Sequence, residues 1–364
     1  MKLVTIVGAR PQFIKAAPVS RMLRNSGIHE IVVHTGQHYD PAMSDLFFDE
    51  LELARPDHHL DIGSGSHGQQ TGRMIEAIEA VLIPAKPDWV LVYGDTNSTL
   101  AGALAAAKLH IPVAHVEAGA RSFNRRMPEE TNRVVTDHVS SLLLAASAAA
   151  VANLRREGFT DEMIRHVGDV MHDTLLLFSA KAEQSSTIVR QLQLTSKNYV
   201  LATIHRAETT DDPSQLAAIF AGLAALSRDL RVVMPLHPRT GAALDVSSKE
   251  EFLAAGGVLL PPVGYLDMLS LQRHAALIVT DSGGIQKEAF FHHVPCITLR
   301  EETEWTELVE LGWNILVPPS RAHTLRDEAA RLRSWRAKPA APYGNGNSAQ
   351  LIVECLVAAV GRTR

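Results

Sequence analysis

Short, continuous apolar runs recur along the chain, and longer stretches with helical spacing of apolar and polar positions separate them. Runs such as 3–7, 89–93 and 276–280 are almost entirely apolar, which predicts strands buried on both faces of a parallel sheet. Stretches such as 213–230 and 349–360 have the length and spacing of helices. The alternation of the two predicts an α/β protein with mainly parallel sheets.

The same pattern predicts the remaining elements. Further strands are expected at residues 31–35, 112–116, 199–204, 231–236, 257–260 and 295–299. Further helices are expected from about residue 13, over 41–51, 69–82 and 100–109, and in the Ala-rich run 145–152. We interpret residues 165–170 as a crossing between two lobes.

Length and composition indicate the class of protein. A chain of 364 residues exceeds what one hydrophobic core usually supports, so two domains are expected. A hydrophobic content of 46% with 21% charged residues is ordinary for a globular protein. The net charge of −5 and the pI near 6.4 argue against nucleic acid or an anionic membrane as the main partner. Any phosphate site must therefore be local.

Cysteine content and hydropathy point to a cytoplasmic protein. The two cysteines, Cys296 and Cys355, form neither a disulfide framework nor a zinc-binding spacing. No apolar run approaches the roughly 20 residues of a membrane span. The apolar start of the chain is too short for a signal peptide. We therefore expect a cytoplasmic location and no bound metal.

One turn suggests a nucleotide site. The apolar run 276–280 leads through Asp281, Ser282, Gly283 and Gly284 into a predicted helix. Such a turn directs backbone N–H groups and a positive dipole end at an anion, and glycines let a phosphate approach. Glu288, one turn into the helix, could bind the hydroxyls of a ribose. The alternative is an ordinary strand-to-helix turn with serine as N-cap.

Cations also follow predicted strands. Arg10 and Lys15 lie at the first strand-to-helix corner, where ligands of open α/β sheets collect, although surface charge is the alternative. His205, Arg206 and His237 follow two later strands. A single histidine is more often structural, but two beside arginines at strand ends favour a phosphate or sugar site.

Three carboxylates are predicted at one sheet edge. Asp95 and Glu117 stand at the carboxyl ends of two predicted strands, and Glu129 stands at the start of a helix. In a doubly wound sheet these positions face one crevice, so a shared site is favoured over three solvated acids.

Seven motifs in order now identify a resemblance that covers essentially the whole chain. They are similar to those of the non-hydrolysing UDP-N-acetylglucosamine 2-epimerases: Gly-Ala-Arg-Pro-Gln at 8–12, Gly-Gln-His at 36–38, Gly-Asp-Thr-Asn at 94–97, His-Val-Glu-Ala-Gly at 115–119, Pro-Glu-Glu at 128–130, His-Arg-Ala-Glu at 205–208 and Asp-Ser-Gly-Gly-Ile-Gln at 281–286.

The resemblance implies a fold. This family has the glycogen-phosphorylase-like (GT-B) arrangement of two Rossmann-like domains with a cleft between them. The implied N-terminal domain covers 1–168 plus 350–364 and carries the catalytic carboxylates. The implied UDP-binding domain covers 169–349.

The resemblance also implies a reaction. Elimination of UDP and of the proton on carbon 2 gives 2-acetamidoglucal, and UDP then adds back after the proton returns on the other face, without NAD or another cofactor. The implied catalytic residues are Asp95, Glu117, Glu129 and His205. The residues implied to bind UDP are Arg10, Lys15, His205, Arg206, Ser282, Gly283, Gly284 and Glu288. Those implied in sugar binding or specificity are Gln37, His38, Arg125, Arg126 and Arg133. Which carboxylate takes the proton stays open, and a homodimer is expected.

Two departures from the family pattern bear on substrate and regulation. The segment 122–127 is shorter than in many members, which makes allosteric activation doubtful. Trp305 replaces an arginine expected to contact UDP, and the same variant resembles the branch acting on UDP-2,3-diacetamido-2,3-dideoxyglucuronic acid. Arg125 or Arg126 could bind that sugar's carboxylate. A GT-B glycosyltransferase, a hydrolysing epimerase and a non-catalytic nucleotide-sugar sensor are the weaker alternatives.

Overall fold

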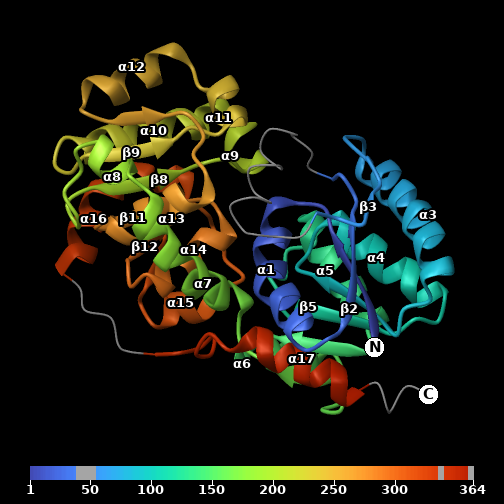
Figure 1. The fold of residues 1–364 in the computed structure, drawn as a ribbon. Helices are drawn as coiled ribbons and strands as arrows, with labels where there is room; N and C mark the ends of the chain where they lie inside the picture. Colours follow the sequence, from blue (N-terminus) through green and yellow to red (C-terminus); the bar gives the residue numbers. More distant parts are fainter. Residues whose placement is uncertain (38–54, 335–339, 360–364) are drawn as a thin grey trace. The chain divides into compact units, whose positions relative to one another are not determined.

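The chain folds into two compact units (Figure 1). The computed structural model describes residues 1–37, 55–334 and 340–359. Unit 1 comprises Met1–Leu177 and Ala341–Arg364, and unit 2 comprises Phe178–Ala340. The domain boundaries predicted after residues 168 and 349 lie close to these limits and stay a prediction. His38 and the helix predicted over 41–51 lie outside the described residues.

Parallel strands form the centre of unit 1. Its described part contains one seven-stranded sheet in the order β3-β2-β1-β4-β5-β6-β7. The strands are β1 (Lys2–Val7), β2 (His29–His34), β3 (His58–His59), β4 (Trp89–Tyr93), β5 (Val113–Ala118), β6 (Leu142–Ala145) and β7 (Ile164–His166). Since β1 pairs with both β2 and β4, the order reverses at β1 and β4, which places a ligand-binding switch point at their carboxyl ends.

Helices cover both faces of this sheet (Figure 1). They are α1 (Arg10–Asn25), α3 (His67–Ala85), α4 (Asn97–Lys108), α5 (Pro128–Val139), α6 (Ala148–Arg156) and α17 (Ser348–Ala359), with α7 (Val170–Ser185) leading into unit 2. Apolar residues of α3 and α4 pack with one face of β1, β2, β4 and β5. Helix α1 packs against α17, and the carboxylate of Asp173 on α7 accepts hydrogen bonds from the amides of Ser348 and Ala349. The last helix is thereby fixed to unit 1.

Unit 2 repeats the same topology. Its described part contains a six-stranded parallel sheet in the order β10-β9-β8-β11-β12-β13. The strands are β8 (Val200–Thr203), β9 (Val232–Pro235), β10 (Val258–Leu260), β11 (Leu277–Thr280), β12 (Cys296–Thr298) and β13 (Asn314–Leu316). The helices are α8 (Ile188–Gln191), α9 (Ala207–Thr210), α10 (Pro213–Ser227), α11 (Pro238–Ala243), α12 (Val246–Ala254), α13 (Tyr265–His274), α14 (Gly283–Phe291), α15 (Thr306–Glu310), η1 (Pro319–Thr324) and α16 (Leu325–Ser334).

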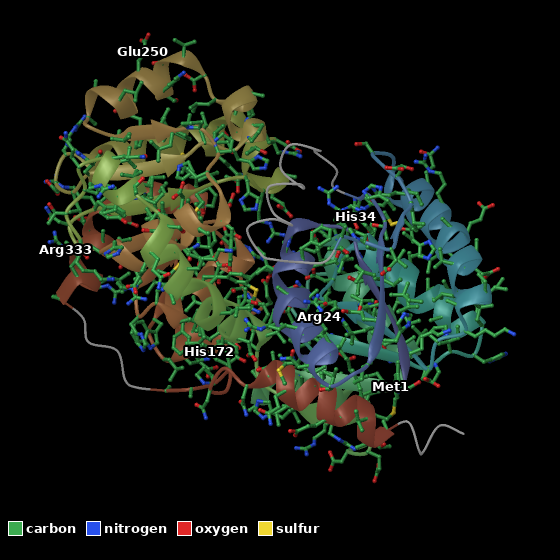
Figure 2. All side chains as sticks on the ribbon, in the orientation of Figure 1. Met1, Arg24, His34, His172, Glu250 and Arg333 are labelled. Atoms are coloured by element: carbon green, nitrogen blue, oxygen red, sulfur yellow. The ribbon has the colours of Figure 1, made fainter. Side chains whose placement is uncertain are left out.

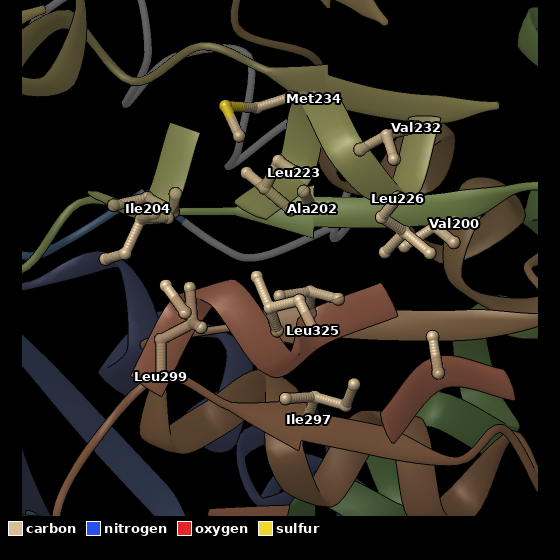
Figure 3. Close-up of a cluster of buried hydrophobic side chains, with 14 of the residues drawn as sticks. Val200, Ala202, Ile204, Leu223, Leu226, Val232, Met234, Ile297, Leu299 and Leu325 are labelled. Carbon is tan, nitrogen blue, oxygen red and sulfur yellow. The ribbon is translucent and has the colours of Figure 1, made fainter. Parts of the chain in front are cut away.

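Two apolar layers hold the sheet of unit 2. On one face, Val200, Ala202 and Met234 of the strands pack against Leu223 of α10 and Leu325 of α16 (Figure 3). The other face packs against α8, α13 and α14. Parallel strands covered on both faces explain why the runs are apolar throughout. The predicted class, two Rossmann-like α/β domains with parallel sheets, is confirmed.

Side chains of one helix differ in their exposure. In α12, Phe252 is buried, whereas Glu250 is exposed (Figure 2). At the carboxyl end of β2, His34 (labelled in Figure 2) stacks on Phe13 of α1, with ring centroids 4.9 Å apart.

In the described part of the chain, no helix combines the length and hydrophobicity needed to cross a membrane.

Two local predictions were wrong. The helix expected over 145–152 begins only at Ala148, because Ala145 ends β6 and pairs with Ala118. The first two residues of the segment interpreted as a crossing, Arg165 and His166, belong instead to β7. They pair with β6 in the sheet of unit 1. Both strands are short, and their pairing with the sheet outweighs the local preference of their residues.

The turn after β1 generates a stability prediction. A Cβ on Gly8 would overlap the hydroxyls of Thr35 and Ser98, so Gly8→Ala should lower the free energy of unfolding by about 1–3 kcal/mol. Gly72→Ala is the matched control, because nothing lies near its added methyl in α3 and alanine favours a helix. Urea unfolding would measure both variants. Equal stability of the two would contradict this close packing.

Candidate active site

A buried ion pair lies at the switch point of unit 1. The ammonium of Lys15 on α1 lies 2.8 Å from a carboxylate oxygen of Glu117 on β5, and the two side chains are 11% and 8% exposed. Glu117 has a φ of 76°, and the pairing of β5 with β6 shifts register there. Such a bulge redirects a side chain at the cost of local strain, a combination that is common at functional sites.

The turn after β4 approaches this pair closely. Gly94 has a φ of +65°, and a Cβ there would lie 3.2 Å from the Lys15 ammonium and 3.7 Å from the Glu117 carboxylate. A side chain is therefore excluded on both conformational and steric grounds. Because Gly94 has no side chain, its backbone can lie next to the Lys15–Glu117 ion pair, directly before Asp95.

Helix α5 secures Asp95 through Arg133. Two guanidinium nitrogens of Arg133 lie 3.0 Å and 2.6 Å from one carboxylate oxygen of Asp95. A third donates to Glu130 at 3.0 Å. Asn132 of the same helix donates to the backbone oxygen of Asp95 at 2.9 Å. The predicted specificity residue Arg133 therefore positions a predicted catalytic carboxylate.

Two adjacent glutamates at the start of α5 have different environments. Glu130 is 1% exposed and accepts hydrogen bonds from Arg133, from the amide and hydroxyl of Ser122 and from the amide of Phe123. It thus holds the loop that precedes α5. Within the described residues, the Glu129 carboxylate oxygen Oε2 is buried without a hydrogen-bond partner. Glu129 is therefore a candidate for contact with a ligand.

The predicted residues of the first turn lie near the same edge. Arg10 begins α1, and Gln37 follows β2. The side-chain oxygen of Gln37 accepts from the amide and the hydroxyl of Ser98, so its contact here is with α4. Arg125 and Arg126 are exposed in the loop before α5.

Sequence reasoning missed Gln12. Its side chain is 1% exposed; the oxygen accepts from the amides of Gly8 and Ala9, and the nitrogen donates to Tyr93 and Thr99. It thereby joins the turn after β1 to the turn after β4. Gln12 belongs to the motif at 8–12. Its role depends on contacts with Tyr93 and Thr99, which are distant in sequence.

In unit 2, Asp281 fixes the predicted histidine. The Asp281 carboxylate is fully buried and accepts from the backbone amides of His205 at 2.9 Å and Arg206 at 3.0 Å. It also lies 3.4 Å from Nδ1 of His205. The rings of His205 and His237 have centroids 5.5 Å apart. The structure therefore brings together the two histidines that the sequence placed at separate strand ends.

The Ser-Gly-Gly turn opens α14 as predicted. Ser282 occupies the N-cap position, but its side chain forms no capping hydrogen bond. A Cβ on Gly284 would meet nothing within 4 Å, whereas one on Gly283 would lie 2.6 Å from the carboxylate of Glu304. Glu304 in turn pairs with Arg300 at 3.0 Å. The first turn of α14 is thus open at Gly284 and next to charged groups at Gly283.

Helix α14 also carries buried polar residues. Glu288, the predicted ribose ligand, is 5% exposed and accepts from the side-chain nitrogen of Gln272 at 2.6 Å. Trp305 donates to the carbonyl of Gly283 at 2.9 Å, and the Lys287 ammonium lies 3.8 Å from the centroid of its ring. Trp305 occupies the position at which the resemblance expects an arginine, and it supports the Ser-Gly-Gly turn through this hydrogen bond.

Comparison with known proteins matches both the sequence and the fold. The sequence profile of UDP-N-acetylglucosamine 2-epimerase matches residues 21–357. The chain belongs to the UDP-N-acetylglucosamine 2-epimerase family. It is 49% identical to a UDP-N-acetylglucosamine 2-epimerase homolog of Methanococcus maripaludis, over 98% of this chain and 99% of that protein. It is 47% identical to the UDP-2,3-diacetamido-2,3-dideoxy-D-glucuronate 2-epimerase of Pseudomonas aeruginosa, with the same coverage.

A solved structure supports the assignment. The chain superposes on the UDP-GlcNAc 2-epimerase of Methanocaldococcus jannaschii, solved in complex with UDP-GlcNAc and UDP, with a TM-score of 0.89. The two are 43% identical, over 98% of this chain and 100% of that one. The predictions of the family, of its GT-B-type fold and of the isomerase class are confirmed.

The two glutamates of α5 should respond differently to the same substitution. Glu130→Gln turns an amide nitrogen toward groups that are all donors and leaves Arg133 short of one carboxylate, so it should cost about 3 kcal/mol of unfolding free energy. Glu129→Gln should stay within about 0.5 kcal/mol. Chemical denaturation would compare them. Equal losses would contradict the division of roles.

Proposed function

We propose that the protein is a non-hydrolysing epimerase that interconverts UDP-N-acetylglucosamine and UDP-N-acetylmannosamine. The main support is the full-length match to a structure that contains UDP-GlcNAc and UDP. The motifs and the carboxylate-rich edge of unit 1 are consistent with the same reaction. The product would serve as a precursor for cell-surface polysaccharides.

The chemistry explains why carboxylates and cations are both needed. The proton on carbon 2 is not acidic, so its removal requires a positioned base and strong assistance to the departing UDP. The base takes the proton, the bond from carbon 1 to UDP breaks, and 2-acetamidoglucal is formed. UDP adds back to carbon 1 after a proton returns to carbon 2 on the opposite face. The glycal must be protected from water between the two halves of the reaction.

We assign the proton exchange at carbon 2 to Glu129. Asp95 and Glu117 already have cationic partners in Arg133 and Lys15, which balance their charge and fix their positions. In the described structure Glu129 has a buried oxygen without a hydrogen-bond donor. Asp95 and Glu117 would then orient the sugar and the departing group.

UDP would be held mainly by groups from unit 2, helped by Arg10 and Lys15. The first amides of α14, at Ser282, Gly283 and Gly284, suit a phosphate. His205, held by Asp281, would assist at the phosphate together with Arg206. Glu288 would bind the ribose, and Gln272 would orient its carboxylate.

A second substrate has support of its own. The 47% identity to the diacetamido-glucuronate epimerase is close to the 49% identity to the UDP-N-acetylglucosamine 2-epimerase homolog. Trp305 occurs where the resemblance expects an arginine, and the exposed Arg125 and Arg126 could bind the carboxylate at carbon 6. UDP-2,3-diacetamido-2,3-dideoxyglucuronic acid is therefore the alternative sugar. A glycosyltransferase does not account for three carboxylates at one edge.

Assembly and location stay predictions. We expect a homodimer, following the resemblance, which light scattering of the purified protein would test. We expect a cytoplasmic location, following the cysteine content and hydropathy.

Proton NMR in deuterated water tests the reaction. Purified protein with UDP-N-acetylglucosamine, without NAD or an acceptor, should form UDP-N-acetylmannosamine with deuterium at carbon 2, because the returning proton comes from solvent. Glu129→Gln should lose this turnover yet still bind UDP. An unchanged wild-type spectrum would exclude this sugar as the substrate, and the diacetamido sugar would be tried next.

Arginine substitution distinguishes the two sugars. Arg125→Ala and Arg126→Ala should leave kcat/KM for UDP-N-acetylglucosamine unchanged and lower it for the acidic sugar about tenfold or more, because one charge-assisted hydrogen bond to the carboxylate is lost. Arg228→Ala, an exposed arginine of unit 2, is the control. If kcat/KM falls equally for both sugar nucleotides, these arginines do not recognise the carboxylate.

A further inference from the structure

A buried histidine joins the two strands that carry the predicted catalytic acids. His115 lies on β5, two residues before Glu117, and is fully buried. Its Nε2 lies 2.7 Å from the carbonyl oxygen of Gly94, the residue before Asp95. Its Nδ1 lies 2.7 Å from a carboxylate oxygen of Asp137 on α5.

Both contacts require a proton on the ring. A carbonyl oxygen only accepts, so Nε2 must carry a hydrogen. An ionised carboxylate also only accepts, so Nδ1 must carry one too, unless Asp137 itself is protonated. The choice lies between a charged ring beside a carboxylate and a neutral ring beside a carboxylic acid.

The surroundings of Asp137 favour the carboxylate. Its other oxygen accepts from Arg121 at 2.7 Å and from the amide of Gly119 at 3.1 Å. Burial alone would raise the pKa of Asp137, but the charges of His115 and Arg121 and the hydrogen bonds they donate outweigh burial, and the pKa is lowered. Two donors other than the ring, Arg121 and the amide of Gly119, therefore favour the ionised acid.

The charges form a balanced series. Arg121 also pairs with Glu157 through two nitrogens, each 2.7 Å from an oxygen. With a charged ring, the order His115, Asp137, Arg121, Glu157 alternates in sign and sums to zero. With a neutral ring, the four groups would sum to one negative charge, and Glu157, whose side chain is 25% exposed, is the member in contact with solvent.

We propose that His115, with a proton on each ring nitrogen, positions the reactive groups of the site. It fixes the carbonyl of Gly94, whose amide is in turn bound to the carbonyl of Val116, so the turn carrying Asp95 is held against the strand carrying Glu117. Asp137 holds the chain on the other side of Glu117 through Gly119. This role rests on the proposed epimerase reaction, in which both acids act on one sugar.

Nitrogen-15 NMR of the histidine rings tests the charge without substrate. The signals of the His115 ring are those that His115→Gln lacks. In the wild-type protein with ¹⁵N-labelled histidine, these signals should show protons on both ring nitrogens at neutral pH. In Asp137→Asn, the amide nitrogen can donate to Nδ1 while the amide oxygen keeps the contacts to Gly119 and Arg121. That ring should then show one bare nitrogen. A bare nitrogen in the wild-type ring would overturn the proposal.

Kinetics test the positioning. His115→Gln should lower kcat about 100-fold and change KM less than about threefold, because misplaced reactive groups slow the chemical step more than they weaken binding. His138 is an exposed histidine of α5, the helix that carries Asp137, and His138→Gln should match the wild type. A folded His115→Gln variant with wild-type kcat would overturn the positioning role. Absence of turnover in the wild type would instead refute the proposed reaction and leave the ring measurement valid.

Discussion

Charges that leave water must be paired, and the arrangement of unit 1 follows from this requirement. Glu117 is buried against Lys15, Asp95 is held by Arg133, and Asp137 lies between His115 and Arg121. Each pair joins elements that are distant in sequence. The pairs therefore fix the ends of β4 and β5 and the start of α5 together. Among the predicted catalytic carboxylates, Glu129 has a buried oxygen without a hydrogen-bond partner in the described residues.

Helix α5 is central to this arrangement. It contributes Glu130 and Arg133 from its first half and Asp137 from its second half, so one rigid element supports the loop before it, the turn after β4 and the chain after Glu117. Side chains mounted on a helix are held more accurately than side chains on a loop. A reaction that removes a weakly acidic proton depends on such accuracy.

In the proposed reaction, unit 2 would bind the anionic UDP. The start of α14 keeps backbone amides available, and Trp305 braces it through the carbonyl of Gly283. Lys287 stacks on that tryptophan, and Glu304 lies beside Gly283 with Arg300 as its partner. Trp305 therefore supports the Ser-Gly-Gly turn through its indole nitrogen. At this position the resemblance expects an arginine that contacts UDP.

The amino-acid sequence determined the class of fold and most of the strands, because strands covered on both faces must be apolar throughout and that requirement is local. The same logic placed Asp95, Glu117 and Ser282 correctly at element ends. The sequence did not reveal β6 as a strand before α6, because Ala145 is equally suited to helix and only its pairing with Ala118 decides. Nor did it reveal Gln12, His115 or Asp137, whose contacts reach across as many as 87 residues. A hydrogen bond between distant residues leaves no periodic signal, so only the tertiary structure shows which of these carboxylates lie beside cations and which has a buried oxygen without a hydrogen-bond partner.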